Sequence, residues 1–513
     1  MKREQTRRRL ASVALGLLAL GSTAACQRAG DDGDELAAGG RLAPELDPLV
    51  EQLFSLDLSP GLAVAVVTGD ELAYARGFGY ADMETGRLVT PGTLFYIAST
   101  TKAFTALAAA LLDHRELLDL DAPISRYVAE LELQPPLSAD EITVRDLLTH
   151  THGIEDGGPV VFRTAYTGEF TEEQLIRLLE EYGPSEAGRA FRYGNLGYNI
   201  AGIVLERATG ETWKVVVDEE ILQPLGMAST SSLMSRIDTV RLAMPHYPTP
   251  DGFRRIRLSK ADENMHAAGG LVTSVLDLAR WLEVQVNEGR LNDRTIFATE
   301  VVRETQRRQV DQDREFGFFH RHGWGLGWDI GTYEQDTLVH RFGSYPGYRP
   351  HVSFMPQHDI GIAVLVNDMP LGGRLADLVA IRIYDHLLGK PGTDEKWAQF
   401  VTDSRGSAAQ ARDALAEDLA RRAARPQSTR LPLPSYVGTY ESEELGTMEW
   451  REGDDGLEVR IGLLRGPVEV FDAERDMFRI ELRGRGEVIQ FRVEDGAVLG
   501  LSYLDREFAK IGP

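Results

Sequence analysis

Hydrophobic residues follow two different patterns along the chain. Residues 62–67 and 72–80 are apolar runs on either side of a Thr-Gly-Asp turn, which predicts two adjacent strands. Residues 101–112 are apolar nearly all round, which is typical of a helix buried inside a large domain. Apolar runs that predict further strands and a closing helix come late, at residues 338–342, 351–355, 360–366 and 373–388. Strands at both ends with helices between them predict an α+β domain over residues 44–392.

The last part of the chain has a period of two. Apolar residues alternate with charged or polar residues in segments 457–461, 478–482 and 489–493. Glycine-containing turns separate these segments, so antiparallel strands are expected. Because a short sheet avoids bare edges by closing on itself, we predict a small antiparallel β-barrel over residues 431–513. Residues 393–425 are charged and alanine-rich, and Pro426, Pro432 and Pro434 mark a boundary after them, which predicts a helical linker over residues 393–430.

Three predicted helix starts carry the pattern of a capping box. In this motif a Ser or Thr side chain and the side chain three residues later each accept a hydrogen bond from the other's backbone N–H. The pairs are Thr143 with Asp146, Thr171 with Gln174, and Ser274 with Asp277.

The N-terminus has the order of a secretory signal. Residues 1–9 are basic, residues 10–20 are apolar, and small residues then lead to Cys26. An apolar run of about 11 residues is too short to span a bilayer as a helix, which needs about 20. We therefore expect residues 1–25 to be a signal peptide and the protein to be exported to a bacterial cell envelope.

Ala24-Ala25-Cys26 resembles a bacterial lipobox, with Thr23 where that motif usually has Leu. The resemblance implies that Cys26 is lipidated, and that residues 26–43 form a tether to the periplasmic or extracellular face of a membrane. The alternative is an ordinary signal peptide with an incidental cysteine. Residues 6–10 also resemble a twin-arginine export signal, and both this route and the Sec route stay open.

The composition of the chain argues against several kinds of partner and binding site. The 513 residues carry a formal net charge of −24, which disfavours nucleic acid as a partner. Since Cys26 is the only cysteine, an intramolecular disulfide and a cysteine-rich zinc site are excluded. The pairs His150/His152 and His320/His322 have metal-ligand spacing but no identifiable third ligand. We expect no metal, no cofactor and no membrane contact beyond a lipid anchor, while the oligomeric state stays open.

The most informative short motif is the S-x-x-K tetrad from Ser99 to Lys102. The chain has no G-x-S-x-G, H-E-x-x-H or Walker A motif. One helical turn places Lys102 on the same face as Ser99. An apolar helix should lower the pKa of this lysine by desolvation, leaving an amine that can take the proton of Ser99. The alternative is a helix cap followed by a lysine that reaches solvent.

A second motif, Tyr193-Gly194-Asn195, is the only Y-x-N in the chain. Together with S-x-x-K it resembles the serine β-lactamase and penicillin-recognising hydrolase family, especially its class C β-lactamase and esterase branch. The resemblance covers most of residues 46–390 and includes the segments 147–154, 224–227, 268–271 and 343–348. It implies a β-lactamase/transpeptidase-like fold with an antiparallel sheet and a helical region. The C-terminal sheet resembles the lipocalin-like domain often appended to such hydrolases.

The resemblance also implies roles for individual residues. Ser99 would attack a carbonyl, while Lys102 and Tyr193 would share its proton and later activate water. Asn195 would hydrogen-bond to Lys102 or to the substrate amide. The backbone N–H groups of Ser99 and Ser344 would form the oxyanion hole.

The third motif departs from the family pattern. The family has K-T-G, or often H-x-G, where this chain has Arg341-Phe342-Gly343, with His340 one residue earlier. Either Arg341 takes the place of the lysine, or a local bulge allows His340 to do so. Arg341 could then hold a substrate carboxylate in a bidentate manner. The alternative is that Arg341 faces solvent as an ordinary strand residue.

The sequence therefore predicts an exported serine hydrolase that forms an acyl-enzyme on an ester or amide, of the esterase or D-amino-acid peptidase type. A β-lactamase or penicillin-binding DD-carboxypeptidase is an alternative, which the missing K-T-G lysine and threonine disfavour. An alternative of another class is a cell-envelope binding protein with low turnover. The sequence does not name the small-molecule or peptide substrate.

Overall fold

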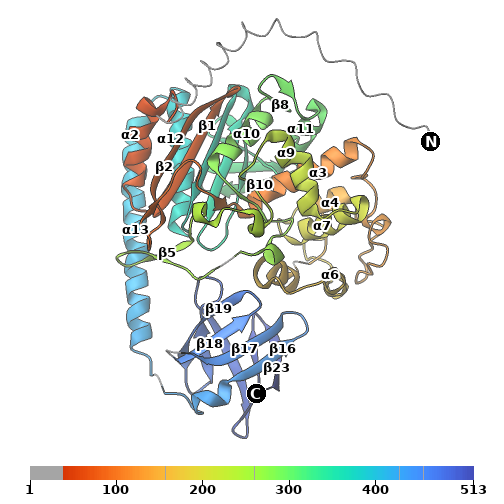
Figure 1. Ribbon diagram of the computed structural model, residues 1–513, viewed down its shortest axis with the longest axis vertical. Coiled ribbons are helices and arrows are strands. Elements are labelled where there is room, and N and C mark those ends of the chain that lie inside the picture. The colour runs from red at the N-terminus through yellow and green to blue at the C-terminus, as the bar shows by residue number, and fades with distance from the viewer. Residues whose placement is uncertain (1–38, 156, 259, 427, 454–455, 513) are drawn as a thin grey trace, which may run out of the picture.

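The computed structural model describes residues 39–155, 157–258, 260–426, 428–453 and 456–512 (Figure 1). The predicted signal peptide and the lipidation site at Cys26 lie outside these residues. No helix in the described ranges combines the length and the apolar character that a membrane span requires.

The first domain is built on a nine-stranded antiparallel sheet with the order β10-β11-β12-β13-β14-β15-β1-β2-β3. The predicted antiparallel sheet is thereby confirmed. Its strands are β1 (Gly61–Thr68), β2 (Glu71–Asp82), β3 (Arg87–Leu88), β10 (Val310–Phe316), β11 (Phe319–Trp324), β12 (Asp329–Tyr333), β13 (Asp336–Phe342), β14 (Arg349–Met355) and β15 (Ile360–Val366).

Helices cover both faces of this sheet, as Figure 1 shows. On one face lie α2 (Ala43–Phe54) and α12 (Leu371–Leu387), and on the other lies α10 (Val275–Val286), which packs on β15 and β1. Successive side chains of β1 point to opposite faces, so that Ala63 and Ala65 belong to one core and Val64 to the other. A strand covered on both faces needs no polar positions, which explains its continuous apolar run.

The face of the sheet that α10 covers also carries a region made mostly of helices. It contains α3 (Thr101–His114), α4 (Val144–Leu148), α5 (Gly158–Phe162), α6 (Glu172–Leu179), α7 (Leu196–Thr209), α8 (Trp213–Val217), α9 (Gln223–Leu225) and α11 (Thr299–Gln306). Three small hairpins or strand pairs complete it: β4 (Phe95–Tyr96) with β7 (Val272–Thr273), β5 (His246–Thr249) with β6 (Gly252–Arg255), and β8 (Arg290–Leu291) with β9 (Arg294–Thr295).

Two of the three expected capping boxes are reciprocal. They begin α4 at Thr143 and α6 at Thr171. At α10 only the Ser274 side chain accepts a hydrogen bond, from the Asp277 N–H. The Asp277 carboxylate instead accepts from the Ser229 N–H at 2.9 Å and from the Thr230 hydroxyl at 2.8 Å. The prediction of a full box there was wrong, because a tertiary contact takes the acceptor.

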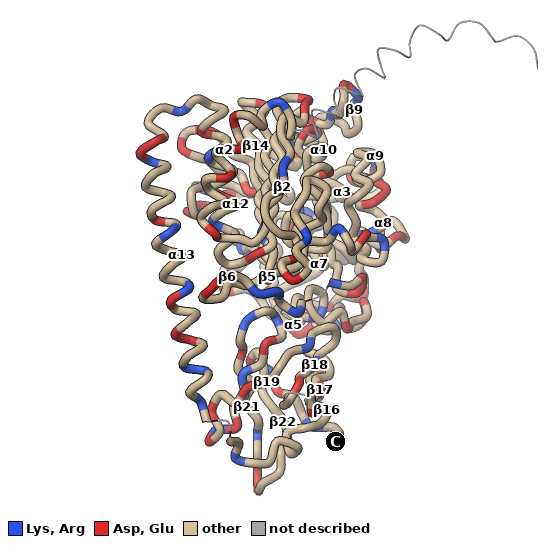
Figure 2. Tube along the Cα trace, turned by 60° about the vertical axis from the view of Figure 1, so that its left-hand side comes forward, with Lys and Arg blue, Asp and Glu red and all other residues tan. Residues whose placement is uncertain are grey.

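A 31-residue helix, α13 (Thr393–Ala423), follows the first domain and leads to the second. Its first half buries one stripe of side chains, at Trp397, Val401, Ser404 and Ala408. Figure 2 shows residues of both charge signs along its length, as expected for a largely solvated helix.

The C-terminal domain is a closed antiparallel barrel, and the barrel prediction is thus confirmed. Its core is aromatic, with Trp450 packed 4.7 Å from Phe491 between ring centroids. The strands are β16 (Gly438–Ser442), β17 (Gly446–Gly453), β18 (Gly456–Ile461), β19 (Leu464–Asp472), β20 (Met477–Ile480), β21 (Glu487–Glu494), β22 (Ala497–Tyr503) and β23 (Arg506–Gly512).

Candidate active site

Ser99 lies at the junction between β4 and α3, in a single turn of 3₁₀ helix over Ala98–Thr100. The preceding residue, Ala98, has a φ of +46°, a left-handed conformation that residues other than glycine rarely adopt. Strained backbone of this kind concentrates at functional sites. One turn further along, the Lys102 Nζ atom lies 3.2 Å from Ser99 Oγ, which is the contact that the tetrad spacing predicts.

Lys102 is fully buried, so its ammonium group depends on protein acceptors. Besides Ser99, its Nζ donates to Asn195 Oδ1 at 2.6 Å and to the Ala268 carbonyl oxygen at 2.9 Å. Desolvation, with a smaller contribution from the nearby Arg341 cation, lowers the pKa of Lys102 to about 8. The lysine is therefore held by its neighbours and can lose its proton near neutral pH.

Tyr193 faces the same point from the segment before α7. Its ring lies 5.1 Å from Lys102 Nζ, and its hydroxyl accepts a hydrogen bond from Arg341 Nη2. Desolvation alone would raise the pKa of Tyr193. The cations of Arg341 and Lys102, with hydrogen bonds from Ser99 and Lys102, outweigh that effect and lower this pKa to about 8. Two potential proton acceptors with similar pKa values thus lie beside Ser99.

Arg341 is buried beneath the site and does not face solvent, since it is 3% exposed. Its Nε donates to the Ser99 carbonyl oxygen at 3.0 Å, and its Nη1 donates to Asp329 Oδ2 at 2.9 Å. Nη2 holds Tyr193, as described above. The guanidinium is therefore committed to Ser99, Tyr193 and Asp329, and the structure does not present it as a clamp for a substrate carboxylate.

The structure places His340 on the opposite face of β13. The pairing of β13 with β14 continues without a shift in register, so no bulge turns this side chain toward Ser99. His340 Nε2 accepts a hydrogen bond from Arg321 at 3.1 Å, and its ring lies 4.5 Å from that of Phe342. Of the two alternatives for the third motif, Arg341 is therefore the residue that reaches the site.

Gly343 lets the end of β13 approach the segment before Ser99. A Cβ at this position would overlap the Ile97 carbonyl oxygen and lie 2.8 Å from Pro350 Cγ. Ser344 follows directly, with its hydroxyl donating to Met369 Sδ at 2.7 Å. Within the described residues, neither the Ser99 N–H nor the Ser344 N–H donates to a backbone carbonyl. Both groups remain available to a carbonyl oxygen of a substrate.

Two aromatic rings pack against the ring of Tyr193. The His150 ring lies 4.8 Å and the Trp324 ring 5.7 Å from the Tyr193 ring, and Trp324 also stacks 5.0 Å from the Arg341 guanidinium. Burial lowers the pKa of His150 well below its usual value, and neither ring nitrogen has a hydrogen-bond partner within the described chain. His150 is therefore neutral and acts here as a packing surface.

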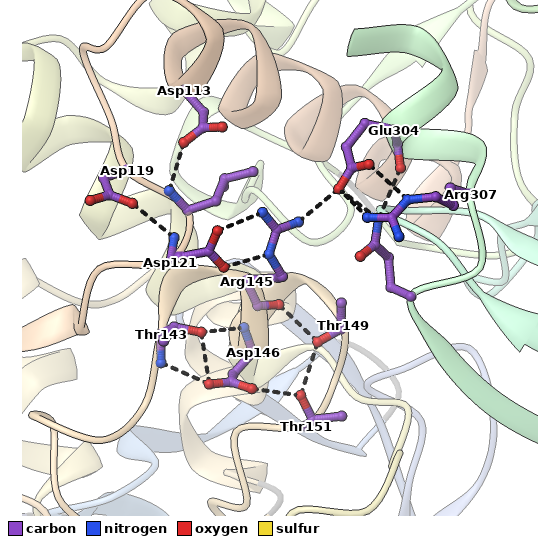
Figure 3. Close-up of polar contacts among 12 residues, drawn as sticks. Asp113, Asp119, Asp121, Thr143, Arg145, Asp146, Thr149, Thr151, Glu304 and Arg307 are labelled. Atoms are coloured by element: carbon purple, nitrogen blue, oxygen red, sulfur yellow. Dashed lines mark hydrogen bonds and ion pairs between the residues drawn. The ribbon is translucent and has the colours of Figure 1, made fainter. Parts of the chain in front are cut away.

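A polar network fixes the turn that carries this histidine (Figure 3). Arg145 on α4 donates to Asp121 Oδ1 at 2.7 Å and to Glu304 Oε1 at 3.1 Å. Asp146 accepts from the Thr151 hydroxyl at 2.9 Å. These contacts tie the end of α4 to its surroundings, and so hold the backbone beside the site.

Comparison with known proteins identifies the family of this chain. The Beta-lactamase family model matches residues 50–385. The chain belongs to the beta-lactamase family. This family comprises serine hydrolases, and the chain is a hydrolase of that family. No group of three or more His, Cys, Asp or Glu side chains in the described ranges is arranged to hold a metal ion.

Two curated relatives can be compared with this chain by sequence. The chain is 30% identical over 324 residues to Esterase EstB from Burkholderia gladioli, which covers 56% of this chain and 79% of EstB. It is 22% identical to Protein flp from Staphylococcus aureus, over 63% of this chain and 62% of flp.

Two solved structures of similar fold extend the comparison. The octameric penicillin-binding protein homologue from Pyrococcus abyssi is 24% identical with a TM-score of 0.59, over 91% of this chain and 100% of that chain. The D-amino acid amidase from Ochrobactrum anthropi SV3 is 22% identical with a TM-score of 0.57, over 67% of this chain and 99% of that chain.

Asp329 and Ala268 are site residues that sequence reasoning missed in this beta-lactamase-family chain. Asp329 follows Trp328 in an apolar segment, and the only sequence signal is that a lone carboxylate there needs a cationic partner. The Ala268 carbonyl gives no side-chain signal at all.

Proposed function

We propose that this hydrolase is exported and cleaves an ester or amide through a covalent acyl-enzyme on Ser99. One observation carries the proposal: Ser99 Oγ lies 3.2 Å from the Nζ atom of a buried lysine whose pKa is lowered to about 8. A hydroxyl beside an amine that can be neutral near pH 7 to 8 is an activated nucleophile.

The proposed reaction begins with Lys102 and Tyr193 sharing one proton. The unprotonated member takes the Ser99 proton as Oγ attacks the substrate carbonyl. The developing oxyanion accepts hydrogen bonds from the backbone N–H groups of Ser99 and Ser344. The proton passes to the leaving alcohol or amine, and the acyl group stays on Ser99.

Hydrolysis of the acyl-enzyme repeats these steps with water. The Lys102 and Tyr193 pair removes a proton from water as it attacks the ester carbonyl, and the pair then returns a proton to Ser99 Oγ. Arg341 stabilises the charge on the Tyr193 oxygen in both halves, while Asn195 holds Lys102 in place. Both act as positioning residues.

Esters or amides are favoured over β-lactams as substrates. The 30% identity to Esterase EstB supports an ester substrate. The lysine and threonine of K-T-G are absent, and Arg341 is directed to Tyr193 rather than to the pocket. Cleavage of a D-amino-acid amide or peptide falls within this proposal, and cleavage of a β-lactam is the second candidate, which the same test addresses.

The test is a substrate panel containing p-nitrophenyl acetate, a D-phenylalanine amide and the chromogenic β-lactam nitrocefin. We expect the highest kcat/KM on the ester, and loss of turnover in Ser99→Ala with an unchanged thermal midpoint. Nitrocefin as the best substrate would contradict the ester assignment. Turnover that survives in Ser99→Ala would contradict the mechanism.

We also propose that the protein is a lipoprotein anchored through Cys26. The proposal is supported by the basic, apolar and small-residue order of residues 1–25 and by the lipobox-like Ala24-Ala25-Cys26. Expressed in a bacterial host with labelled palmitate, the full chain should incorporate label and partition into detergent, whereas Cys26→Ser should do neither. Equal incorporation by both forms would contradict it.

A further inference from the structure

The barrel supplies one wall of a cleft that reaches the catalytic tyrosine. This cleft has a volume of about 550 Å³. Tyr193, Gly194 and Asn195 line one side of it, and barrel residues that include Leu445 and Leu504 line another. Figure 2 shows α5, which also contributes lining residues, at the boundary between the first domain and the barrel.

The barrel is fixed at this boundary by buried contacts. Arg163, which is 7% exposed, donates to the carbonyl oxygens of Glu443 at 2.7 Å and of Glu444 at 2.6 Å. Phe162 of α5 belongs to the barrel core, where its ring lies 6.0 Å from that of Tyr503. The wall is therefore held in a defined position relative to Tyr193.

Leu504 occupies an unusual place in this wall. The pair Tyr503 and Arg506 closes a two-residue turn between β22 and β23, in which Leu504 has a φ of +52° and Asp505 one of +59°. Turns with two left-handed residues favour Asn and Gly, and a leucine there is strained. The neighbouring β21–β22 turn has the expected kind of residues, Asp495-Gly496.

Leu504 is also exposed to solvent, with 38% of its surface accessible. Neither local folding preference nor burial in the barrel accounts for a leucine at this position. Leu504 lines the cleft together with Val161 and Phe162 of α5. An apolar group bound there would bury the exposed part of the leucine.

The charges in the wall are largely neutralised within the protein. Arg483 forms an ion pair with Glu487, and Arg506 forms one with Glu444. Paired arginines do not select for an anion in the way that an unpaired cation would. Asp505 adds a carboxylate to the lining, which disfavours an anionic group. The apolar part of the wall, formed by Leu504, Leu445, Val161 and Phe162, offers hydrophobic contact to a ligand.

We propose that Leu504, at the tip of the β22–β23 hairpin, is a specificity-determining residue that contacts an apolar chain of the substrate in the cleft beside Tyr193. The inference rests on the proposed Ser99 hydrolase function and narrows its substrate class to esters or amides with an extended apolar group. The barrel then takes part in substrate selection, although it contributes no catalytic residue.

The test compares kcat/KM for p-nitrophenyl octanoate and p-nitrophenyl acetate. Leu504→Asn suits the turn and removes the apolar side chain, so the octanoate-to-acetate ratio should fall by about fivefold to tenfold. Leu504→Met keeps an apolar side chain and should keep the ratio. The matched control is Leu499→Asn on β22, a leucine that is 39% exposed but lies outside the cleft lining, and it should leave the ratio unchanged.

An unchanged ratio in Leu504→Asn, or an equal fall in Leu499→Asn, would overturn the inference. Labelling of Ser99 by a fluorophosphonate in every variant distinguishes a failure of the specificity role of Leu504 from a failure of the proposed hydrolase function. If the label attaches to Ser99 and the ratio does not move, the specificity role fails while the hydrolase function stands. If Ser99 is not labelled in the unmodified protein, the proposed function itself fails.

Discussion

At the residue scale, the proposed mechanism depends on Lys102, Tyr193 and Arg341, whose charges influence one another. Ser99, Lys102, Tyr193 and Asn195 could be predicted because two short motifs carry them, and the structure brings all four together. The role of Arg341 could not be predicted in the same way. Its direction depends on Asp329 of the neighbouring strand, a contact that no local pattern encodes.

The pH dependence of the reaction follows from the Lys102 and Tyr193 pair. Both pKa values are lowered to about 8, and a general base must be unprotonated to act. We therefore expect kcat/KM for a neutral ester to increase as the pH is raised through about 8. A pH–rate profile over the range in which the protein stays folded measures this. An acid limb with its midpoint near 6 would instead indicate a histidine or carboxylate base.

Arg341 should control that midpoint. Because its cation lowers the pKa of Tyr193, Arg341→Met should move the acid limb to higher pH by about 1 unit or more. Arg341→Lys, which keeps a positive charge, should move it less. Neutral and anionic esters should be affected equally, since the guanidinium is committed to protein partners. A rise in KM of Arg341→Met that is confined to anionic esters would contradict this and would support a role of Arg341 in binding a substrate carboxylate.

At the scale of elements, the strands and helices that carry the site could be predicted from the spacing of hydrophobic residues along the chain. The contacts between these elements could not. Segment 324–328 contains two glycines, Gly325 and Gly327, whose neighbours the sequence does not reveal. Only the structure shows that Gly327, with a φ of +84°, lies against α3 at Lys102. Similarly, the Ser274 capping pattern could not show that a distant loop takes the Asp277 carboxylate.

Gly327→Ala should displace the start of α3. A Cβ there would lie 2.6 Å from Ala103 Cα and 2.7 Å from the Lys102 carbonyl oxygen, and both are backbone atoms that cannot rotate away. We expect a loss of stability of about 1–3 kcal/mol and a fall in kcat. The control is Gly317→Ala in the β10–β11 turn, which has a φ of +62° but no atom within 4 Å of a Cβ.

The Gly317→Ala control separates the effect of left-handed backbone strain from the effect of a steric clash with α3. Gly317→Ala should cost only about 1–2 kcal/mol of left-handed strain and leave kcat unchanged. Thermal unfolding and ester hydrolysis of both variants are the measurements. Equal kcat values in the two variants would argue against a role of the Gly327 contact in placing Lys102.

At the scale of the whole molecule, the described part of the chain forms two domains that meet near the candidate active site. Sequence pattern predicted the barrel itself, but its position over the cleft depends on a few tertiary contacts that composition does not encode. The main one is Arg163, whose guanidinium reaches the carbonyl oxygens of Glu443, Glu444 and Glu169. A buried arginine within a helical segment gives no sequence signal that its barrel partners, Glu443 and Glu444, lie about 280 residues away.

Arg163→Met should loosen this contact between the domains. Buried carbonyl groups left without a donor cost about 1–3 kcal/mol each, so the loss of stability should be at least about 2 kcal/mol. Hydrogen exchange should increase in residues 443–446 and in α5. Arg465→Met, at an exposed barrel position, is the control and should change neither quantity. Unaltered exchange at residues 443–446 in Arg163→Met would show that other contacts hold the barrel.

The central claim is that Ser99 becomes acylated, and covalent labelling tests it most directly. The folded protein would be treated with a fluorophosphonate at pH 8, digested and analysed by mass spectrometry. We predict one modified residue, Ser99, with no label in Ser99→Ala and much slower labelling in Lys102→Ala. An active enzyme that carries no label, or a label on any other residue with Ser99 unmodified, would contradict the account.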